Sequence, residues 1–160
     1  MVLRLRFPFV FVVAVAGLAP AVVHAQRRDA FVLSRDHPAI RYSNGEVDNP
    51  IVRLNERLAK GEVRLSYDPA NGYLRSLLDA LSIPVSSQSL VFSKTSFQAD
   101  LITMHNPRAI FFNESVAVGW VRGGPVLEFV AQDPHQGSIF YTLSQSESGV
   151  PQFERNDTCV

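Results

Sequence analysis

The residues that could do chemistry are few in this 160-residue sequence, and they are scattered along it. Beyond residue 25 the histidines are His37, His105 and His135, and each lies close to a proline or within a turn sequence. Paired metal-binding histidines usually stand at short helical or strand spacing, which this sequence lacks. The spacing therefore predicts solvated turn histidines and no metal site within the chain.

Catalytic groupings are also incomplete. A serine hydrolase needs a nucleophile on a sharp glycine-flanked turn, together with a histidine and an acid. Ser115 has no glycine elbow, and Ser138 merely follows a turn glycine. The carboxylates of Glu114, Glu128 and Asp133 lie near predicted strand ends, where a pair could act as acid and base on a sugar. Single acids in strands more often mark the solvent-facing side, so no catalytic residue is assigned.

Glycines and aromatic residues are concentrated in the second half of the chain. Gly119, Gly123 and Gly124 follow an apolar run but open no helix, so turn geometry explains them better than phosphate binding. Adjacent rings such as Phe111 and Phe112 point to opposite sides of a strand, so we expect one in the core and one partly exposed. The aromatic residues predict core packing, with a ligand platform as the alternative; they are Phe111, Phe112, Trp120, Phe129, Phe140 and Tyr141.

Two helices are predicted to precede these residues. Asn49-Pro50 combines a good N-cap with a first-turn proline, apolar residues then recur at helical spacing, and Gly61 ends the segment. Asp68-Pro69 has the same form, and the leucines that follow repeat at three- and four-residue steps as far as Ile83-Pro84.

A run of strands is predicted after Pro84. Gly123-Gly124-Pro125 indicates a hairpin, and the sequence from Asp133 to Gly137 indicates a type I turn. We therefore predict an α+β fold over residues 49–144, with N-terminal helices followed by an antiparallel, meander-like β-sheet. Residues 26–48 are expected to be an extended lead-in, and the polar residues 145–160 a linker. The predicted strands cover residues 89–97, 108–112, 116–122, 126–132 and 138–144.

Residues 1–25 have the features of a cleavable signal peptide. Arg4 and Arg6 precede an apolar run over residues 7–23, and Val23-His24-Ala25 provides small residues before a cut at Gln26. The apolar run of 17 residues is at the lower limit for crossing a bilayer and is interrupted by prolines and a glycine. The sequence predicts export to the periplasm, with no membrane span in the mature chain.

Composition limits the partners of the mature chain. The whole sequence has 15 basic and 15 acidic residues, and removal of the two arginines with the signal leaves a net charge of −2. This balance favours neither nucleic acid nor an acidic membrane surface. The single cysteine, Cys159, cannot form an internal disulfide. It pairs with another chain, stays a free thiol, or belongs to a motif that continues past Val160.

Several long strings carry a family resemblance. They lie at residues 72–78 (GYLRSLL), 85–98 (VSSQSLVFSKTSFQ), 106–113 (NPRAIFFN), 118–121 (VGWV), 123–125 (GGP), 133–137 (DPHQG) and 140–143 (FYTL). Together they resemble the N-terminal region of a family of exported bacterial proteins described as cytochrome c domain-containing. In that family the polar stretch after the last strand leads into a Cys-x-x-Cys-His haem motif. The resemblance implies that Cys159 is the first haem-attachment cysteine and that the sequence is truncated inside this motif.

The resemblance implies a periplasmic N-terminal domain of a c-type cytochrome-like protein, with a role in electron transfer or haem-linked sensing. Haem c would belong to the intact protein, because stable attachment needs the second cysteine and the axial histidine. We expect no haem on these 160 residues alone, and the redox partner is unspecified. The alternatives are a haem-independent exported binding module for a peptide or a carbohydrate and, with less support, an exported hydrolase. The sequence favours a non-enzymatic role.

Overall fold

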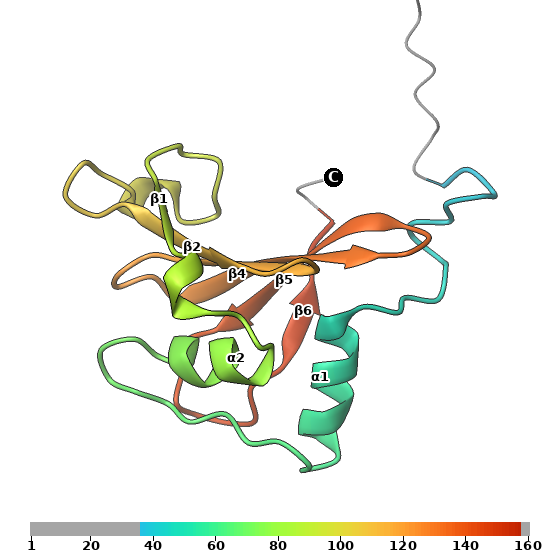
Figure 1. Ribbon diagram of the computed structural model, residues 1–160, viewed down its shortest axis with the longest axis horizontal. Coiled ribbons are helices and arrows are strands. Elements are labelled where there is room, and N and C mark those ends of the chain that lie inside the picture. The colour runs from blue at the N-terminus through green and yellow to red at the C-terminus, as the bar shows by residue number, and fades with distance from the viewer. Residues whose placement is uncertain (1–35, 158–160) are drawn as a thin grey trace, which may run out of the picture. The chain divides into compact units, whose positions relative to one another are not determined.

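The computed structural model describes residues 36–157, which contain one six-stranded antiparallel sheet. Each strand pairs with the next along the chain, so the spatial order is the sequence order from β1 to β6 (Figure 1). The strands are β1 (Ser89–Val91), β2 (Arg108–Phe112), β3 (Val116–Trp120), β4 (Val126–Asp133), β5 (Gly137–Ser144) and β6 (Phe153–Arg155). The helices are α1 (Pro50–Ala59) and α2 (Leu74–Ala80), with short 3₁₀ turns η1 (Val85–Ser87) and η2 (Ala99–Leu101).

The predicted fold class was wrong in its balance of elements. We expected N-terminal helices followed by a sheet, but residues 36–157 form mostly a sheet with two short helices of 10 and 7 residues. The result is a small fold of α+β type in which the helices are accessories to the sheet. The predicted meander of antiparallel strands agrees with the observed strand order.

The second helix is shorter than predicted because its expected start is a turn. The Asp68 carboxylate accepts hydrogen bonds from the backbone N–H groups of Ala70 and Asn71, which is an Asx-turn and not a helix cap. Asp68 and Gly72 also exchange backbone hydrogen bonds, and Gly72 has a φ of 62°. Helical geometry therefore begins only at Leu74.

The first helix has the predicted cap, and that cap also attaches the helix to the sheet. The Asn49 side chain accepts hydrogen bonds from the backbone N–H groups of Ile51 and Val52. Its Nδ2 donates to the hydroxyl of Tyr141 on β5 at 2.9 Å, and Asn49 is completely buried. Burial raises the pKa of the Tyr141 hydroxyl and the hydrogen bond from Asn49 lowers it. The effect of burial is the larger, so the pKa is raised above its ordinary value.

The core lies between the helices and one face of the sheet (Figure 1). Side chains alternate along each strand, so every second residue of β2 to β5 points toward α1 and α2. The buried residues of this face are Ala109, Phe111, Val116, Val118, Leu127, Phe129, Ala131, Ile139, Tyr141 and Leu143. We call the opposite side, which carries the intervening residues, the outer face.

The segments on either side of the predicted domain also take part in the fold. Residues 36–48 were expected to be extended, yet the His37 carbonyl accepts from the N–H groups of Ile40 and Arg41, and Tyr42 is buried in the core. In the predicted linker, Phe153 is buried with its ring edge against Phe129, at 5.0 Å between ring centroids. No helix within residues 36–157 has the length and apolar character needed to cross a membrane.

Replacing Asn49 by alanine should destabilise the fold substantially. The change removes a helix cap and leaves the buried Tyr141 hydroxyl without its partner, so we expect a loss of about 2–4 kcal/mol in the free energy of unfolding. Urea unfolding followed by circular dichroism measures this loss. Asn44→Ala, at an exposed turn position, is the matched control. Equal stability of the two variants would contradict the anchoring role of Asn49.

Candidate functional site

The outer face of the sheet carries a row of apolar side chains. Phe112, Ala117, Val130 and Phe140 lie directly opposite one another on β2, β3, β4 and β5. Directly opposed residues have Cβ atoms about 4.5–5.5 Å apart, so the row forms a continuous strip. Phe112 is 48% exposed and the other three are half-buried. Neither α1 nor α2 covers this strip.

A loop after β1 lies beside the strip and bounds a groove that takes in Ala117, Val130 and Phe140 but not Phe112. We predicted a strand over residues 89–97, but the strand ends at Val91. The backbone N–H of Thr95 donates to the Ser93 hydroxyl, and that of Gln98 donates to the Ser96 hydroxyl. These local hydrogen bonds form turns in place of strand pairing. The outer groove has a volume of about 590 Å³; among its lining residues are Thr95, Ser96, Phe97, Arg108, Ile110, Ala117, Gly119, Glu128, Val130 and Phe140.

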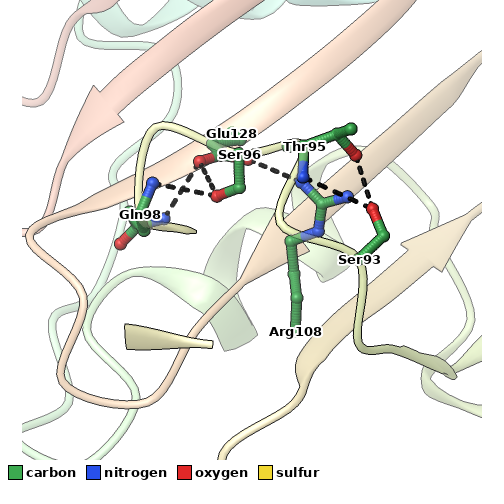
Figure 2. Close-up of polar contacts among 6 residues, drawn as sticks. All are labelled: Ser93, Thr95, Ser96, Gln98, Arg108 and Glu128. Carbon is green, nitrogen blue, oxygen red and sulfur yellow. Dashed lines mark hydrogen bonds and ion pairs between the residues drawn. The ribbon is translucent and has the colours of Figure 1, made fainter. Parts of the chain in front are cut away.

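The loop is fastened to the sheet by the carboxylate of Glu128 on β4 (Figure 2). Its Oε1 accepts hydrogen bonds from Ser96 Oγ at 2.6 Å and from Gln98 Nε2 at 3.3 Å. Its Oε2 accepts from Arg108 Nη1 at 3.0 Å, and the same nitrogen donates to the Thr95 carbonyl at 2.8 Å. Hydrogen bonds to a charged group are stronger than neutral ones. We refer to Ser96, Gln98, Arg108 and Glu128 as the Glu128 cluster.

The ion pair of this cluster spans two strands that are not neighbours. Arg108 is on β2 and Glu128 is on β4, so the arginine must cross β3. It crosses at Gly119, which lies opposite Glu128, and a Cβ placed on Gly119 would be 3.4 Å from Arg108 Cδ. Gly119 was predicted to be a turn glycine, and that prediction was wrong because it lies within β3. Its missing side chain leaves room for the arginine.

The cluster is largely shielded from water but incompletely bonded. The side chains of Arg108 and Glu128 are 12% and 13% exposed. Arg108 Nε and Gln98 Oε1 are buried without a hydrogen-bond partner in the described part of the chain. Removing one member of a buried ion pair leaves the other charge unpaired, which is strongly destabilising. The arginine and the glutamate therefore depend on each other.

The predicted catalytic candidates do not come together. Ser138 Oγ accepts a hydrogen bond from Gln132 Nε2, and Ser115 donates its backbone N–H to Asn113. Glu128 and Asp133 lie on opposite faces of β4, with Glu128 on the outer face and Asp133 on the core side. Glu114 is exposed in the turn between β2 and β3.

The histidines lie in turns, as the sequence predicted. His37 Nδ1 accepts from the backbone N–H of Ala39, and the backbone N–H groups of His105 and His135 donate to the side chains of Thr103 and Asp133. Within residues 36–157 no three histidine, cysteine or acidic side chains are grouped to hold a metal ion.

Asp133 has a structural role. Burial alone would raise the pKa of its carboxyl group, but hydrogen bonds from the backbone N–H groups of Gln136, Asp48 and His135 lower the pKa below its ordinary value of 3.8. These bonds fix the β4–β5 turn, where Gly137 has a φ of 77°, and join that turn to the start of α1.

The prediction for the aromatic pair on β2 is confirmed. Phe111 is 4% exposed in the core, and its neighbour Phe112 is 48% exposed on the outer face. Of the other aromatic residues, Phe140 lines the groove and Trp120 packs against the core. Phe129 and Tyr141 also contribute to the groove lining, although both residues are buried in the core.

Sequence reasoning missed most of the groove. Phe97, Arg108, Ile110 and Val130 were not singled out, and Glu128 was considered only as an acid–base group. A usable signal was present, because β2 has apolar residues at consecutive positions, which indicates a strand with two apolar faces.

The haem-related expectations fall on residues outside the described range. Cys159 and the predicted signal peptide, residues 1–25, both lie outside residues 36–157. The haem-attachment role of Cys159, the haem c of the intact protein and export therefore stay predictions. Comparison of the chain with protein-family models, with curated proteins and with solved structures gave no match.

Substituting Ser96 by alanine should loosen the loop over the groove. The change removes the acceptor of the Gln98 N–H and one charge-assisted hydrogen bond to Glu128, the latter worth about 1.5–3 kcal/mol. We therefore expect amide exchange at residues 95–98 to accelerate by about tenfold or more. Hydrogen–deuterium exchange measures the rates. Ser93→Ala is the matched control, because Ser93 bonds only to Thr95 in the same loop. The same exchange rates in both variants would show that Glu128 does not fasten the loop.

Asp133→Asn should weaken the fold at neutral pH and flatten its response to acid. The pKa of the Asp133 carboxyl group is lower in the folded protein than in the unfolded chain, where it is near 3.8. The carboxylate therefore stabilises the fold at any pH above 3.8, and this contribution disappears as the pH falls through the lower, folded-state pKa. Urea midpoints at about pH 7 and about pH 3 measure the difference. The control is Glu114→Gln, at an exposed carboxylate. A pH dependence equal to that of the unmodified protein would contradict this assignment.

Proposed function

We propose that the mature chain is an exported binding module whose ligand occupies the outer groove. One observation carries the proposal, namely the apolar row of Phe112, Ala117, Val130 and Phe140 on a face that α1 and α2 leave uncovered. An antiparallel sheet with one face open to water normally presents polar side chains there. A contiguous apolar patch with a polar rim is typical of an interaction site.

The geometry of the groove supports a preformed site. Its volume of about 590 Å³ falls within the range of small-ligand sites. The loop that forms its wall is held by the hydrogen bonds of Ser96 and Gln98 to Glu128. A wall already fixed before binding loses little conformational entropy when the ligand arrives.

A peptide fits the groove better than a carbohydrate. The floor is largely aliphatic, from Ile110, Ala117 and Val130. Phe97, which is 47% exposed, and the half-buried Phe140 also line the groove. A sugar ring brings several hydroxyl groups, each of which needs a hydrogen-bond partner when it leaves water. The nearby polar groups of Ser96 and Glu128 are already bonded to each other, and the unused donors of Arg108 can serve one acceptor but not the several hydroxyl groups of a sugar. An apolar side chain of a peptide needs no such partners.

A neutral apolar dye provides the direct test. We expect N-phenyl-1-naphthylamine to bind the protein purified from the periplasm with a saturable rise in fluorescence. Val130→Glu places a charge on the floor and should weaken binding by about tenfold or more, because burial of one valine side chain contributes about 1.5–3 kcal/mol. Gln132→Glu is the control, because it adds the same charge on the same face of β4 at an exposed position outside the groove, and it should leave binding unchanged.

The two variants decide between the outcomes. Binding that is weakened at position 130 and unchanged at position 132 supports the groove as the site. Absence of saturable binding, or equal binding by both variants, would rule out the proposed function.

A further inference from the structure

The guanidinium of Arg108 has more hydrogen-bond donors than the protein uses. Its hydrogen bonds come from Nη1, which donates to Glu128 and to the Thr95 carbonyl. Nε is buried without a partner, and Nη2 makes no hydrogen bond within residues 36–157. Buried donors in folded proteins are almost always paired, so an unpaired one calls for an explanation. Nε is closed off from the groove, whereas Nη2 is not among the buried atoms. Since Arg108 lines the outer groove, a ligand is in position to supply an acceptor to Nη2.

The charge of the arginine restricts what that acceptor can be. Glu128 Oε2 lies 3.0 Å from Arg108 Nη1, so the positive charge is already balanced. An anionic ligand at the same guanidinium would also face the Glu128 carboxylate, and like charges at short range in a poorly solvated site repel. A neutral carbonyl oxygen accepts from the N–H groups of Nη2 without that penalty.

We propose that the outer groove binds a neutral, extended peptide segment, with an apolar side chain on the floor and a backbone carbonyl accepting from Arg108. This inference rests on the proposed function and names its ligand. The apolar row crosses four strands, which at about 4.8 Å between strands is about 14 Å. An extended chain advances about 3.3 Å per residue, so the strip accommodates about four residues.

Displacement of N-phenyl-1-naphthylamine tests the ligand class. The probes are acetyl-Ala-Leu-Val-Ala-amide, the same peptide with a free C-terminal carboxylate, and maltotriose. We expect the amide to displace the dye at least as well as the acid, and maltotriose to have no effect. Displacement by the acid about tenfold better than by the amide, or displacement by maltotriose, would overturn the inference.

Two further measurements test the role of Arg108. Arg108→Lys keeps the charge that faces Glu128 but loses the planar fork of donors. It should reduce peptide affinity about three- to tenfold more than it reduces dye affinity, as expected for one hydrogen bond. Arg122→Lys, exposed and outside the groove lining, is the control and should change neither affinity. In the unmodified protein, the NMR signals of the Arg108 Nη2 hydrogens should shift with the peptide and not with the dye.

Each result bears on one level of the proposal. If the dye binds and neither peptide displaces it, the peptide inference fails while the binding module stands. If the dye does not bind, both fail. Equal losses of peptide and dye affinity in Arg108→Lys, together with unmoved Nη2 hydrogen signals, would rule out the proposed hydrogen bond.

Discussion

The site depends on a single carboxylate, that of Glu128, in the middle of the outer face. It accepts from Ser96, Gln98 and Arg108, which come from a loop and from a strand two places away in the sheet. Without these bonds the loop would keep, among the described residues, only the hydrogen bond from Arg108 to the Thr95 carbonyl, and that arginine would lose its ion-pair partner. The open space beside it would then be an average over loop positions, because a loop with few buried apolar contacts opens at little cost. The Glu128 cluster therefore converts an apolar strip into a groove with a defined wall.

The other face of the sheet shows what the outer face lacks. There α1 and α2 complete the core, and the buried Asn49 joins a helix cap to Tyr141. A single layer of sheet covered on one side buries half of its side chains, and a soluble sheet of this kind usually places polar residues on the other half. Ile110 and Val130 depart from that pattern. Apolar side chains that are open to solvent in strands favour aggregation unless they serve an interaction, and these two half-buried residues are therefore consistent with the proposed binding function.

The sequence predicted the local features well and the long-range ones poorly. The cap at Asn49, the β4–β5 turn and the four strands from β2 to β5 follow from residue types and spacing within a short window. The loop after β1 looked like a strand because Leu90 and Phe92 alternate with polar residues. Its conformation is decided by Glu128, more than 30 positions further along the chain, which no local pattern reveals. Gly119 was misinterpreted for the same reason, since its role is to leave space for an arginine from another strand.

The ion pair between Arg108 and Glu128 holds the loop in a way that an apolar contact could not. An apolar residue at position 128 would pack against the loop, and replacing a buried ion pair by apolar groups is often neutral or stabilising. Apolar contacts are not directional, however, so such a loop would tend to settle onto Ile110 and Val130 and fill the groove. Hydrogen bonds to a carboxylate fix both distance and angle, and they hold Ser96 and Arg108 away from the floor. The neutral pair also leaves the unused donors of the arginine at the wall without giving the groove a net charge. On the proposed function, stability is thereby exchanged for a groove of fixed shape that favours a neutral acceptor.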